Sequence, residues 1–375
     1  MRPQIFEPGD AAGVAAALQT ANNDGLSVVV RGSGSKFTPP TTSPADVVLA
    51  TTKLTKGIDH VAGDLVATVP AGASLDAVNE VLRRERQWLP LDPPRGHRAT
   101  IGGIVATNDS GPRRHRFGAP RDLIIGIEVA LADGRIAKAG GRVVKNVAGY
   151  DLSKLMCGSL GTLAVVTSAT FKLSPVAPFS QTLVATVSEL RTLADIARAI
   201  AAAPVGPTAI ELQSPPHRLL VRFETTEAAA AAQTKIAAGI CAAHGATTNV
   251  ISGQAETDAW LAHENRIFTA GSTVVKIAVL PTEVGDMLSA IQRLTAGIDD
   301  VGIAGRAALG IVLLRLPNDY DHVVDELRRE ASARGGHVAA PGNPGSLGDA
   351  GGIMRAVKAR FDPHHILNIG IAPWD

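Results

Sequence analysis

The N-terminal part of the chain alternates between helical and strand-like hydrophobic patterns. Residues 10–24 place Val14 and Leu18 on one face of a helix, with Asp10 in position to cap its start. Gly25 is typical of a helix end. Short apolar runs of strand length follow along the chain. The predicted strands cover residues 27–31, 46–50, 65–69, 123–131, 135–138 and 163–173.

Two further signals indicate that helices and antiparallel strands are combined in this N-terminal region. Ser74 is placed to cap a helix whose Val78 and Leu82 share one face. Residues 132–134, Ala-Asp-Gly, form a turn signal between two of the predicted strands and indicate an antiparallel hairpin. We therefore expect an α/β domain with mixed sheets, which differs from a regular array of βαβ units.

A proline-rich exit at 173–178 separates this region from a second one with its own alternation. The predicted organisation is a first domain over 1–178, a second over 179–345 and a C-terminal helix and tail over 346–375 that returns to the first domain. For the second domain we expect an antiparallel sheet covered by helices on one face, an α+β cap. Its predicted helices are 189–202, 226–243, 282–295 and 319–334, and its predicted strands are 181–187, 208–213, 218–223, 273–279, 301–304, 309–315 and 337–340.

Composition narrows the class of protein. A hydrophobic fraction of 45% with 19% charged residues is ordinary for a folded chain, and 36 basic against 35 acidic residues give a net charge of +1. Such a balance provides no field that would attract nucleic acid or an anionic membrane. No signal peptide and no run of about 18 apolar residues occurs. We expect a cytoplasmic protein, held at a membrane, if at all, by a partner.

The two cysteines, Cys157 and Cys241, lie in different predicted domains. They exclude a disulfide framework, and they also exclude an iron–sulfur cluster made by this chain alone, which usually needs four thiolates. We expect Cys157 to be a small buried thiol.

Two glycine turns carry the candidate chemistry. Residues 28–35 read as a buried strand that ends in a turn of small residues, and residues 99–108 repeat that composition around Gly102 and Gly103. Successive backbone N–H groups in such turns can point into one concavity and bind a phosphate. Two phosphate-sized sites in one domain indicate a dinucleotide.

A nicotinamide-binding Rossmann fold fits this pattern poorly. It requires G-x-G-x-x-G with a helix opening directly on the glycines. Here Gly32 and Gly34 are followed by Phe37, and Pro39 and Pro40 stand where the helix would begin. Two tight turns without a ligand remain a further alternative.

A third segment changes the interpretation. It reads Lys-Asn-Val-Ala-Gly-Tyr-Asp-Leu at 145–152 and leads into a third glycine-rich stretch around Gly158 and Gly161. Together the motifs resemble the FAD-binding domain of the vanillyl-alcohol oxidase, or PCMH-type, flavoprotein family, and within it the FAD-binding E subunits of bacterial glycolate oxidases. The resemblance implies a PCMH-type domain of two α/β subdomains followed by an antiparallel α+β cap. The segments that carry it are 31–35, 89–94, 101–108, 110–114, 145–155, 158–167, 361–363 and 367–370.

The resemblance also implies where FAD binds. The glycine turns and Lys36 would hold the pyrophosphate, and the other positions would line the ribityl chain, adenine or flavin ring. The implied cofactor-binding residues are Arg31, Gly32, Ser33, Gly34, Ser35, Lys36, Pro93, Pro94, Gly102, Gly103, Ala106, Thr107, Asn108, Asp109, Gly118, Gly161, Thr162, Val165 and Val166.

Covalent attachment of FAD in this family uses a histidine or cysteine, often a histidine in the first glycine turn. That turn has no histidine here, so we expect non-covalent FAD. His97 and His115 in neighbouring loops are weaker candidates for a link or a proton acceptor. No metal is expected, because the cap histidines stand singly at spacings that fit surface or turn positions better than metal ligation. These cap histidines are His217, His244, His263, His322 and His337.

The catalytic residues stay open. The candidates are Arg113, Arg114 and His97. The two arginines belong to a basic set with Arg95, Arg98 and Arg116, which could bind a carboxylate, dock a partner or form an ordinary surface. Related catalytic chains carry a histidine motif in the cap, H-x₆-H followed by an acidic run, and residues 180–345 lack it.

Three hypotheses follow for the function. The first is an FAD-binding electron-transfer subunit of a glycolate-oxidase-like 2-hydroxy-acid dehydrogenase complex, with a sister FAD-containing catalytic subunit and an iron–sulfur subunit as partners. The second is a self-sufficient FAD-dependent dehydrogenase of a hydroxy acid or sugar acid. The third is a structural assembly subunit with weak flavin binding.

Overall fold

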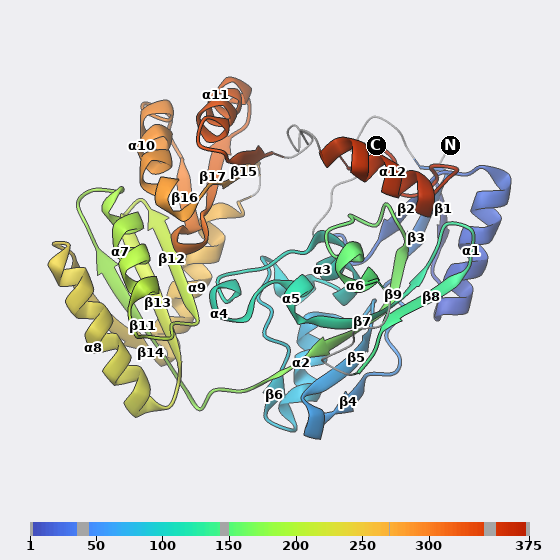
Figure 1. The fold of residues 1–375 in the computed structure, drawn as a ribbon, viewed down its shortest axis with the longest axis horizontal. Coiled ribbons are helices and arrows are strands. Elements are labelled where there is room, and N and C mark those ends of the chain that lie inside the picture. The colour runs from blue at the N-terminus through green and yellow to red at the C-terminus, as the bar shows by residue number, and fades with distance from the viewer. Residues whose placement is uncertain (1–2, 36–44, 143–149, 270, 341–349, 373–375) are drawn as a thin grey trace. The chain divides into compact units, whose positions relative to one another are not determined.

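The computed structural model describes residues 3–35, 45–142, 150–269, 271–340 and 350–372 (Figure 1). The chain forms two compact units. The first unit contains residues 1–111, 117–176 and 346–375, and the second contains 112–116 and 177–345. Each unit has its own hydrophobic core. The predicted α+β class is confirmed, with helices, a parallel sheet and antiparallel sheets in one chain.

A small parallel sheet opens the first unit. Strands β1 (Gln4–Phe6), β3 (Val47–Ala50) and β2 (Val28–Arg31) pair in that order. Helix α1 (Ala11–Asp24) begins as predicted, because the side chain of Asp10 accepts a hydrogen bond from Gly13 N, and it ends at Gly25 in the left-handed conformation. Its Val14 and Leu18 are buried in the core.

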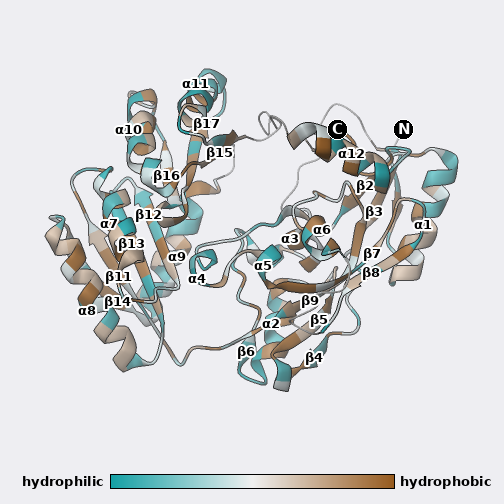
Figure 2. Cartoon of the chain, in the orientation of Figure 1, coloured by the Kyte–Doolittle hydropathy of each residue, from teal (hydrophilic) through white to brown (hydrophobic). Residues whose placement is uncertain are grey.

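The second sheet of the first unit has five strands, β4 (Asp59–Val61), β5 (Val66–Pro70), β9 (Val165–Lys172), β7 (Ile124–Ala130) and β8 (Ile136–Gly140), in that order. All its pairings are antiparallel, and β7 and β8 form the predicted hairpin. Hydrophobic residues run along β7 and β9 (Figure 2). Helices α2 (Leu75–Arg83), capped by Ser74 as predicted, and α3 (Ile101–Thr107) pack on the same core. Shorter elements of the first unit are α5 (Pro120–Leu123), α6 (Leu152–Met156), β6 (Gln87–Trp88) and β10 (Ser174–Pro175). The short helix α4 (Arg114–Phe117) belongs mostly to the second unit.

An eight-stranded antiparallel sheet forms the second unit, as expected for the cap. Its strands alternate between two faces, so that in β12 the side chains of Ile210 and Leu212 enter the apolar core while Glu211 lies on the opposite face. In order across the sheet, the strands are β14 (Thr247–Ser252), β11 (Phe179–Thr186), β13 (Arg218–Thr225), β12 (Ala209–Ser214), β16 (Gly302–Arg306), β17 (Ile311–Pro317), β15 (Ser272–Ala278) and β18 (His337–Ala339).

The expectation that helices cover only one face of this sheet is wrong. Helices α7 (Thr192–Ala202), α8 (Glu227–Ala243), α10 (Val284–Leu294) and α11 (Asp321–Ser332) supply apolar residues to the large core. Helix α9 (Gly253–Ile267) instead packs on the other face, where its Trp260 joins Ala209 and Leu220 in a separate cluster (Figure 1). We call this second face the α9 face. The sequence analysis predicted neither α9 nor β14.

The C-terminal segment belongs to the first unit. Helix α12 (Ala350–Phe361) ends before Asp362, and the tail that follows pairs with β2 through a parallel bridge between Leu367 and Val28. Lys358 fixes this return, because its buried Nζ donates to Asp362 Oδ2 at 2.6 Å and to the carbonyl oxygens of Thr162 and Leu367, both at 2.9 Å.

Candidate functional site

A cavity in the first unit lies where β2 ends in the first glycine turn. Three stretches of the chain that are distant in sequence form it, namely the turn after β2, helix α3 and the segment before β9. Eleven of the residues implied by the family resemblance line this cavity. They are Arg31, Gly32, Ser33, Gly34, Ser35, Gly102, Gly103, Ala106, Thr107, Gly161 and Val166.

Two of the glycines are required by the packing of the protein itself. A Cβ atom on Gly32 would lie 2.2 Å from Thr100 Oγ1, and one on Gly102 would lie 3.0 Å from Ala71 Cβ. Gly103 differs, because a Cβ there would approach only Thr100 Oγ1, at 3.2 Å. A larger side chain at 103 would therefore extend into the cavity.

The backbone amides of the two turns differ in what they offer. Gly102 N donates to the carbonyl oxygen of Ala71 at 2.8 Å, so its N–H is not free for the phosphate role that we assigned to it. Gly103 N makes only a long contact of 3.4 Å with Thr100 Oγ1. The amides of residues 32–35 have no hydrogen-bond partner among the residues that the structure describes.

These features suit an anionic ligand. Free N–H groups in a turn of small residues form a concavity that binds phosphate. The guanidinium of Arg31 lies beside Gly34, because its Nε and one terminal nitrogen would each be 3.0 Å from a Cβ atom built on Gly34. Among the described residues, no carboxylate lines the cavity. The residues present therefore fit the pyrophosphate of FAD, and the first glycine turn carries most of the free donors.

Seven other implied residues do not line this cavity, and Lys36 lies outside the described residues. Val165 and Thr162 are buried. Asn108 ends α3 in the left-handed conformation, and its Oδ1 accepts a hydrogen bond from Arg121 N at 3.1 Å. Gly118 also has a positive φ, and a Cβ there would lie 2.7 Å from Asp122. The full set comprises Pro93, Pro94, Asn108, Asp109, Gly118, Thr162 and Val165.

The sequence analysis missed other lining residues, of which Asn368 is the most informative. Its Oδ1 accepts from Val30 N at 2.8 Å and its Nδ2 donates to the carbonyl oxygen of Leu160 at 2.7 Å. It thus holds the end of β2 against the third glycine segment. The signal available was the motif 367–370, which marks the tail as part of the flavin domain but does not single out Asn368.

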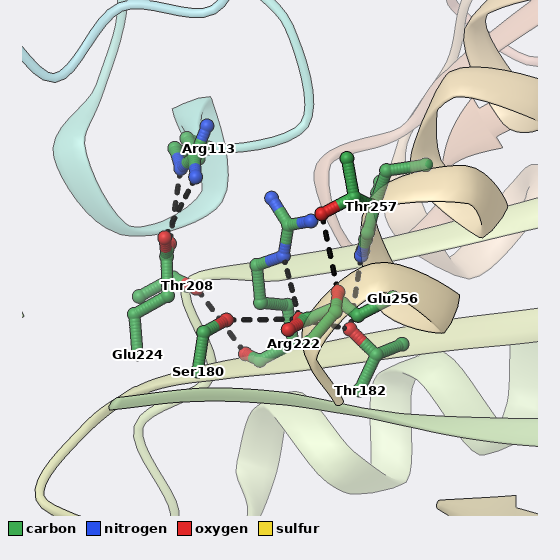
Figure 3. A network of polar contacts seen from close by, with 10 residues as sticks. Arg113, Ser180, Thr182, Thr208, Arg222, Glu224, Glu256 and Thr257 are labelled. Carbon is green, nitrogen blue, oxygen red and sulfur yellow. Dashed lines mark hydrogen bonds and ion pairs between the residues drawn. The ribbon is translucent and has the colours of Figure 1, made fainter. Parts of the chain in front are cut away.

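The candidate catalytic residues are divided between the two units. His97 is exposed in the first unit, together with Arg95 and Arg98. Arg113 lies in the second unit, where its Nε and one terminal nitrogen donate to the two carboxylate oxygens of Glu224 at 3.0 and 2.7 Å (Figure 3). This bidentate pair neutralises Arg113 within its own unit.

Arg114, His115 and Arg116 continue the short segment of the second unit that begins before Arg113, and Arg116 is exposed. Burial lowers the pKa of His115, with Arg116 acting in the same direction and Glu211 against both. His115 is therefore mostly neutral at pH 7.

The α9 face carries a polar network (Figure 3). Glu256 of α9 accepts hydrogen bonds from Ser180 Oγ at 2.9 Å, Thr182 Oγ1 at 2.7 Å and Arg222 Nε at 3.1 Å. The Arg222 guanidinium also stacks 4.2 Å from the centre of the Trp260 ring. These groups satisfy one another, which ties α9 to β11 and β13.

A second buried group on the α9 face overturns one expectation about the cap histidines. His263 is 5% exposed, with Nε2 3.1 Å from Glu211 Oε2 and Nδ1 3.0 Å from Gln213 Oε1. It is therefore neither a surface nor a turn residue. Arg306 Nε lies 3.2 Å from the other oxygen of Glu211. Among the described residues, no three His, Cys, Asp or Glu side chains gather to hold a metal ion.

Comparison with known protein families gives the cofactor. Residues 3–140 match the family described as FAD binding domain. The glycolate oxidase subunit GlcD of Bacillus subtilis is 28% identical over 99% of this chain and 88% of its own length. The glycolate oxidase subunit GlcE of Escherichia coli is 37% identical over 48% of this chain and 51% of its own length. A D-lactate dehydrogenase of Archaeoglobus fulgidus is 36% identical over 46% of this chain and 38% of its own length. The chain thus spans about half or less of the length of these last two relatives.

Solved structures agree on the fold. Alkyldihydroxyacetonephosphate synthase superposes with a TM-score of 0.76, over 97% of this chain and 75% of the other, at 16% identity. The predicted PCMH-type architecture is therefore confirmed. Within the described part of the chain, no helix has both the length and the apolar composition needed to cross a membrane.

Proposed function

We propose that this chain, an FAD-dependent oxidoreductase with an FAD binding domain, is an electron-transfer subunit of a larger complex. The complex would be a 2-hydroxy-acid dehydrogenase of the glycolate oxidase type. Two of its relatives, from different bacteria, are named as subunits of glycolate oxidase. The first aligns with 99% of this chain, which supports a common ancestry for both units. FAD, when bound, would accept two electrons together and release them singly, which suits a position next to one-electron carriers.

The observation that supports the electron-transfer role is that mostly buried carboxylates of the second unit are already paired with neighbouring side chains. Oxidation of a hydroxy acid needs a base for the hydroxyl proton and a cation for the carboxylate. On the α9 face, Glu211 is held by His263 and Arg306, and Glu256 by Arg222. Arg113, the first of our catalytic candidates, is paired with Glu224. These three carboxylates are of the type that a base requires, but each is already engaged with an arginine of the same unit.

The partners follow from what this chain contains. Its two cysteines are buried and lie in different units, so they cannot supply the four thiolates of a typical cluster. We therefore propose a sister FAD-containing subunit that oxidises the hydroxy acid and an iron–sulfur subunit that takes the electrons onward.

The decisive experiment is a dye-reduction assay with glycolate and with D-lactate. We expect the FAD-loaded single chain to show little turnover, and turnover to appear when the second flavoprotein and the iron–sulfur subunit are added. A matched control replaces this chain in the set by its Gly103→Asp variant, which should lose the contribution of this subunit. Brisk turnover by the single chain would contradict the proposal.

A self-sufficient dehydrogenase is the second candidate, because several relatives are named D-lactate dehydrogenase or D-2-hydroxyglutarate dehydrogenase. In that case, turnover by the single chain should fall when Arg114 is replaced by alanine. Arg113→Ala is a poorer test, since it also leaves Glu224 without its partner. Measured flavin content separates both candidates from a structural subunit that binds FAD weakly.

A further inference from the structure

A second cavity, of about 360 Å³, lies within the second unit on the α9 face. The strand register explains its position. Thr186 of β11 pairs with Thr247 of β14 and with Arg218 of β13, and Arg218 pairs with Gln213 of β12. These four residues thus form one row across the sheet and point to the same face. All four line the cavity.

Helix α9 provides the opposite wall. Ala259, Ala262 and Arg266 line the cavity and recur at intervals of three and four residues, which places them on one side of the helix. The two alanines fill little of the space between helix and sheet. The side of α9 with Glu256, Trp260 and His263 is the buried one described above, so this cavity is separate from that network.

The charges of this cavity are unbalanced. Its lining includes two arginines, Arg218 and Arg266, and no aspartate or glutamate. Arg266 donates from Nη1 to the carbonyl oxygen of Pro215, but its Nε is buried and has no hydrogen-bond partner among the described residues. The neighbouring Arg315 brings no spare carboxylate, because Asp300 is engaged with it through two hydrogen bonds of 2.6 and 2.7 Å.

The electrostatic strain on Arg266 agrees with this geometry. Burial lowers the pKa of Arg266 from its usual value, and the charges of Arg218 and Arg315 lower it further. A buried donor without a partner and a cation beside other cations are both unfavourable. A bound anion would satisfy the first and compensate the second.

We propose that this cavity is a binding site for a small organic anion that carries two or more negative oxygen-bearing groups, such as a di- or tricarboxylate. Arg218 and Arg266 would pair with the acidic groups, and the hydroxyl groups of Thr186 and Thr247 and the amide of Asn249 would bind the remaining oxygens. The volume lies in the range of small-molecule sites and exceeds what a single inorganic ion fills. The site is distinct from the cavity around Gly32 and Gly103 in the first unit, which we assign to FAD and call the FAD cavity, since all residues of the second cavity belong to the second unit.

The test uses the FAD-saturated full chain and titration calorimetry with citrate and with inorganic phosphate, at an ionic strength held constant with sodium chloride. We expect saturable binding of citrate that is tighter than that of phosphate. Arg266→Gln and Arg218→Gln should each weaken citrate about tenfold or more, the loss expected for a charge-assisted hydrogen bond. Arg198→Gln is the matched control, because Arg198 lies on α7 against the other face and pairs only with Asp195 among the described residues. It should leave citrate binding within about twofold of the parent.

A further variant keeps both arginines, so that its loss of citrate binding cannot result from misfolding caused by an arginine substitution. Ala262→Leu places volume in the cavity from an exposed helix position and should also abolish citrate binding, while flavin content and circular dichroism stay as in the parent. The proposal is overturned if citrate and phosphate bind no better than chloride, or if the two arginine variants bind citrate like the parent.

Discussion

At the scale of single residues, Gly103 offers the sharpest test of the FAD cavity. Gly32 and Gly102 are poor test positions, since a side chain there would collide with Thr100 or press on Ala71. A side chain at Gly103 enters the cavity with little cost to the fold. We expect Gly103→Asp to abolish FAD binding, because the carboxylate would both fill the site and repel the pyrophosphate.

Flavin content after purification and a titration of the apoprotein with FAD measure this effect. The matched control is Gly63→Asp, at an exposed glycine with an ordinary φ and open space around its Cβ position. That variant should bind FAD like the parent. Normal FAD binding by Gly103→Asp would show that the pyrophosphate lies elsewhere.

Lys358 and Asp362 form the second residue-scale prediction. Both are almost fully buried, and Asp362 also accepts from the backbone N–H groups of Ile366 and Leu367. Removing one partner of such a pair leaves a buried charge. We expect Lys358→Met to lower the free energy of unfolding of the first unit by about 3–5 kcal/mol. Urea denaturation measures it.

The exposed pair of Lys154 and Asp151 is the control for that comparison, since both side chains are about half exposed. Lys154→Met should change the free energy of unfolding by less than about 1 kcal/mol. Equal effects of the two substitutions would contradict the structural role that we give to Lys358.

At the scale of elements, the segment 112–116 depends on the ion pair between Arg113 and Glu224. Burial alone would raise the pKa of Glu224, but the hydrogen bonds and charge of Arg113, together with the charge of Arg222, bring the pKa below its ordinary value. A lowered folded-state pKa contributes stability that is fully present above the unfolded pKa of about 4.5 and is lost as the pH falls further.

We therefore expect the second unit to lose stability more steeply below pH 4.5 in the parent than in Glu224→Gln. In Arg113→Gln, burial acts on a carboxylate without its main counterion and raises the pKa of Glu224, so this variant should be less stable than the parent at pH 7 and should lose less stability than the parent as the pH falls. Urea denaturation between pH 7 and pH 3.5 measures all three proteins. Identical pH profiles for the parent and Glu224→Gln would refute the role of this pair.

The same scale shows what could be predicted from sequence. Helices with a clear apolar face, such as α1 and α10, and apolar runs of strand length, such as β13, were predicted close to their observed bounds. Helix α9 was missed because its buried side includes Glu256 and His263, so hydrophobic periodicity does not mark it. Strand β14 was missed because it is an edge strand with mostly exposed polar residues.

For the FAD cavity, the glycine turns were predictable because their composition dictates their local conformation. Asn368 and Lys358 were not, since their roles depend on contacts with residues more than 190 positions away in the sequence. Gly102 shows the reverse case, in which the residue lines the cavity as expected but its N–H donates to Ala71. Hydrogen-bond partners of this kind are set by tertiary packing, which the sequence pattern does not record.

At the scale of the whole molecule, the FAD cavity draws on all three stretches of the first unit. Gly32 and Gly103 belong to residues 1–111, Gly161 to residues 117–176, and Asn368 to residues 346–375. A ligand bound there would contact residues of all three stretches. Bound FAD should therefore stabilise the unit as a whole, by about 2.7 kcal/mol at a concentration of 100 times its Kd.

The last prediction concerns how this cofactor is held in the molecule. A covalent link needs a histidine or a thiolate at the flavin, and the first glycine turn, residues 31–35, contains neither residue type. Burial raises the pKa of Cys157 to about 12 and that of Cys241 to about 11, so neither thiol is ionised near pH 7. We expect acid precipitation to release all the flavin into the supernatant as FAD, and the recovered apoprotein to regain its yellow colour and its thermal stability with added FAD. Flavin that stays with the precipitate and migrates with the denatured chain on a gel would contradict this, and replacing His97 by alanine would then show whether that exposed histidine forms the link.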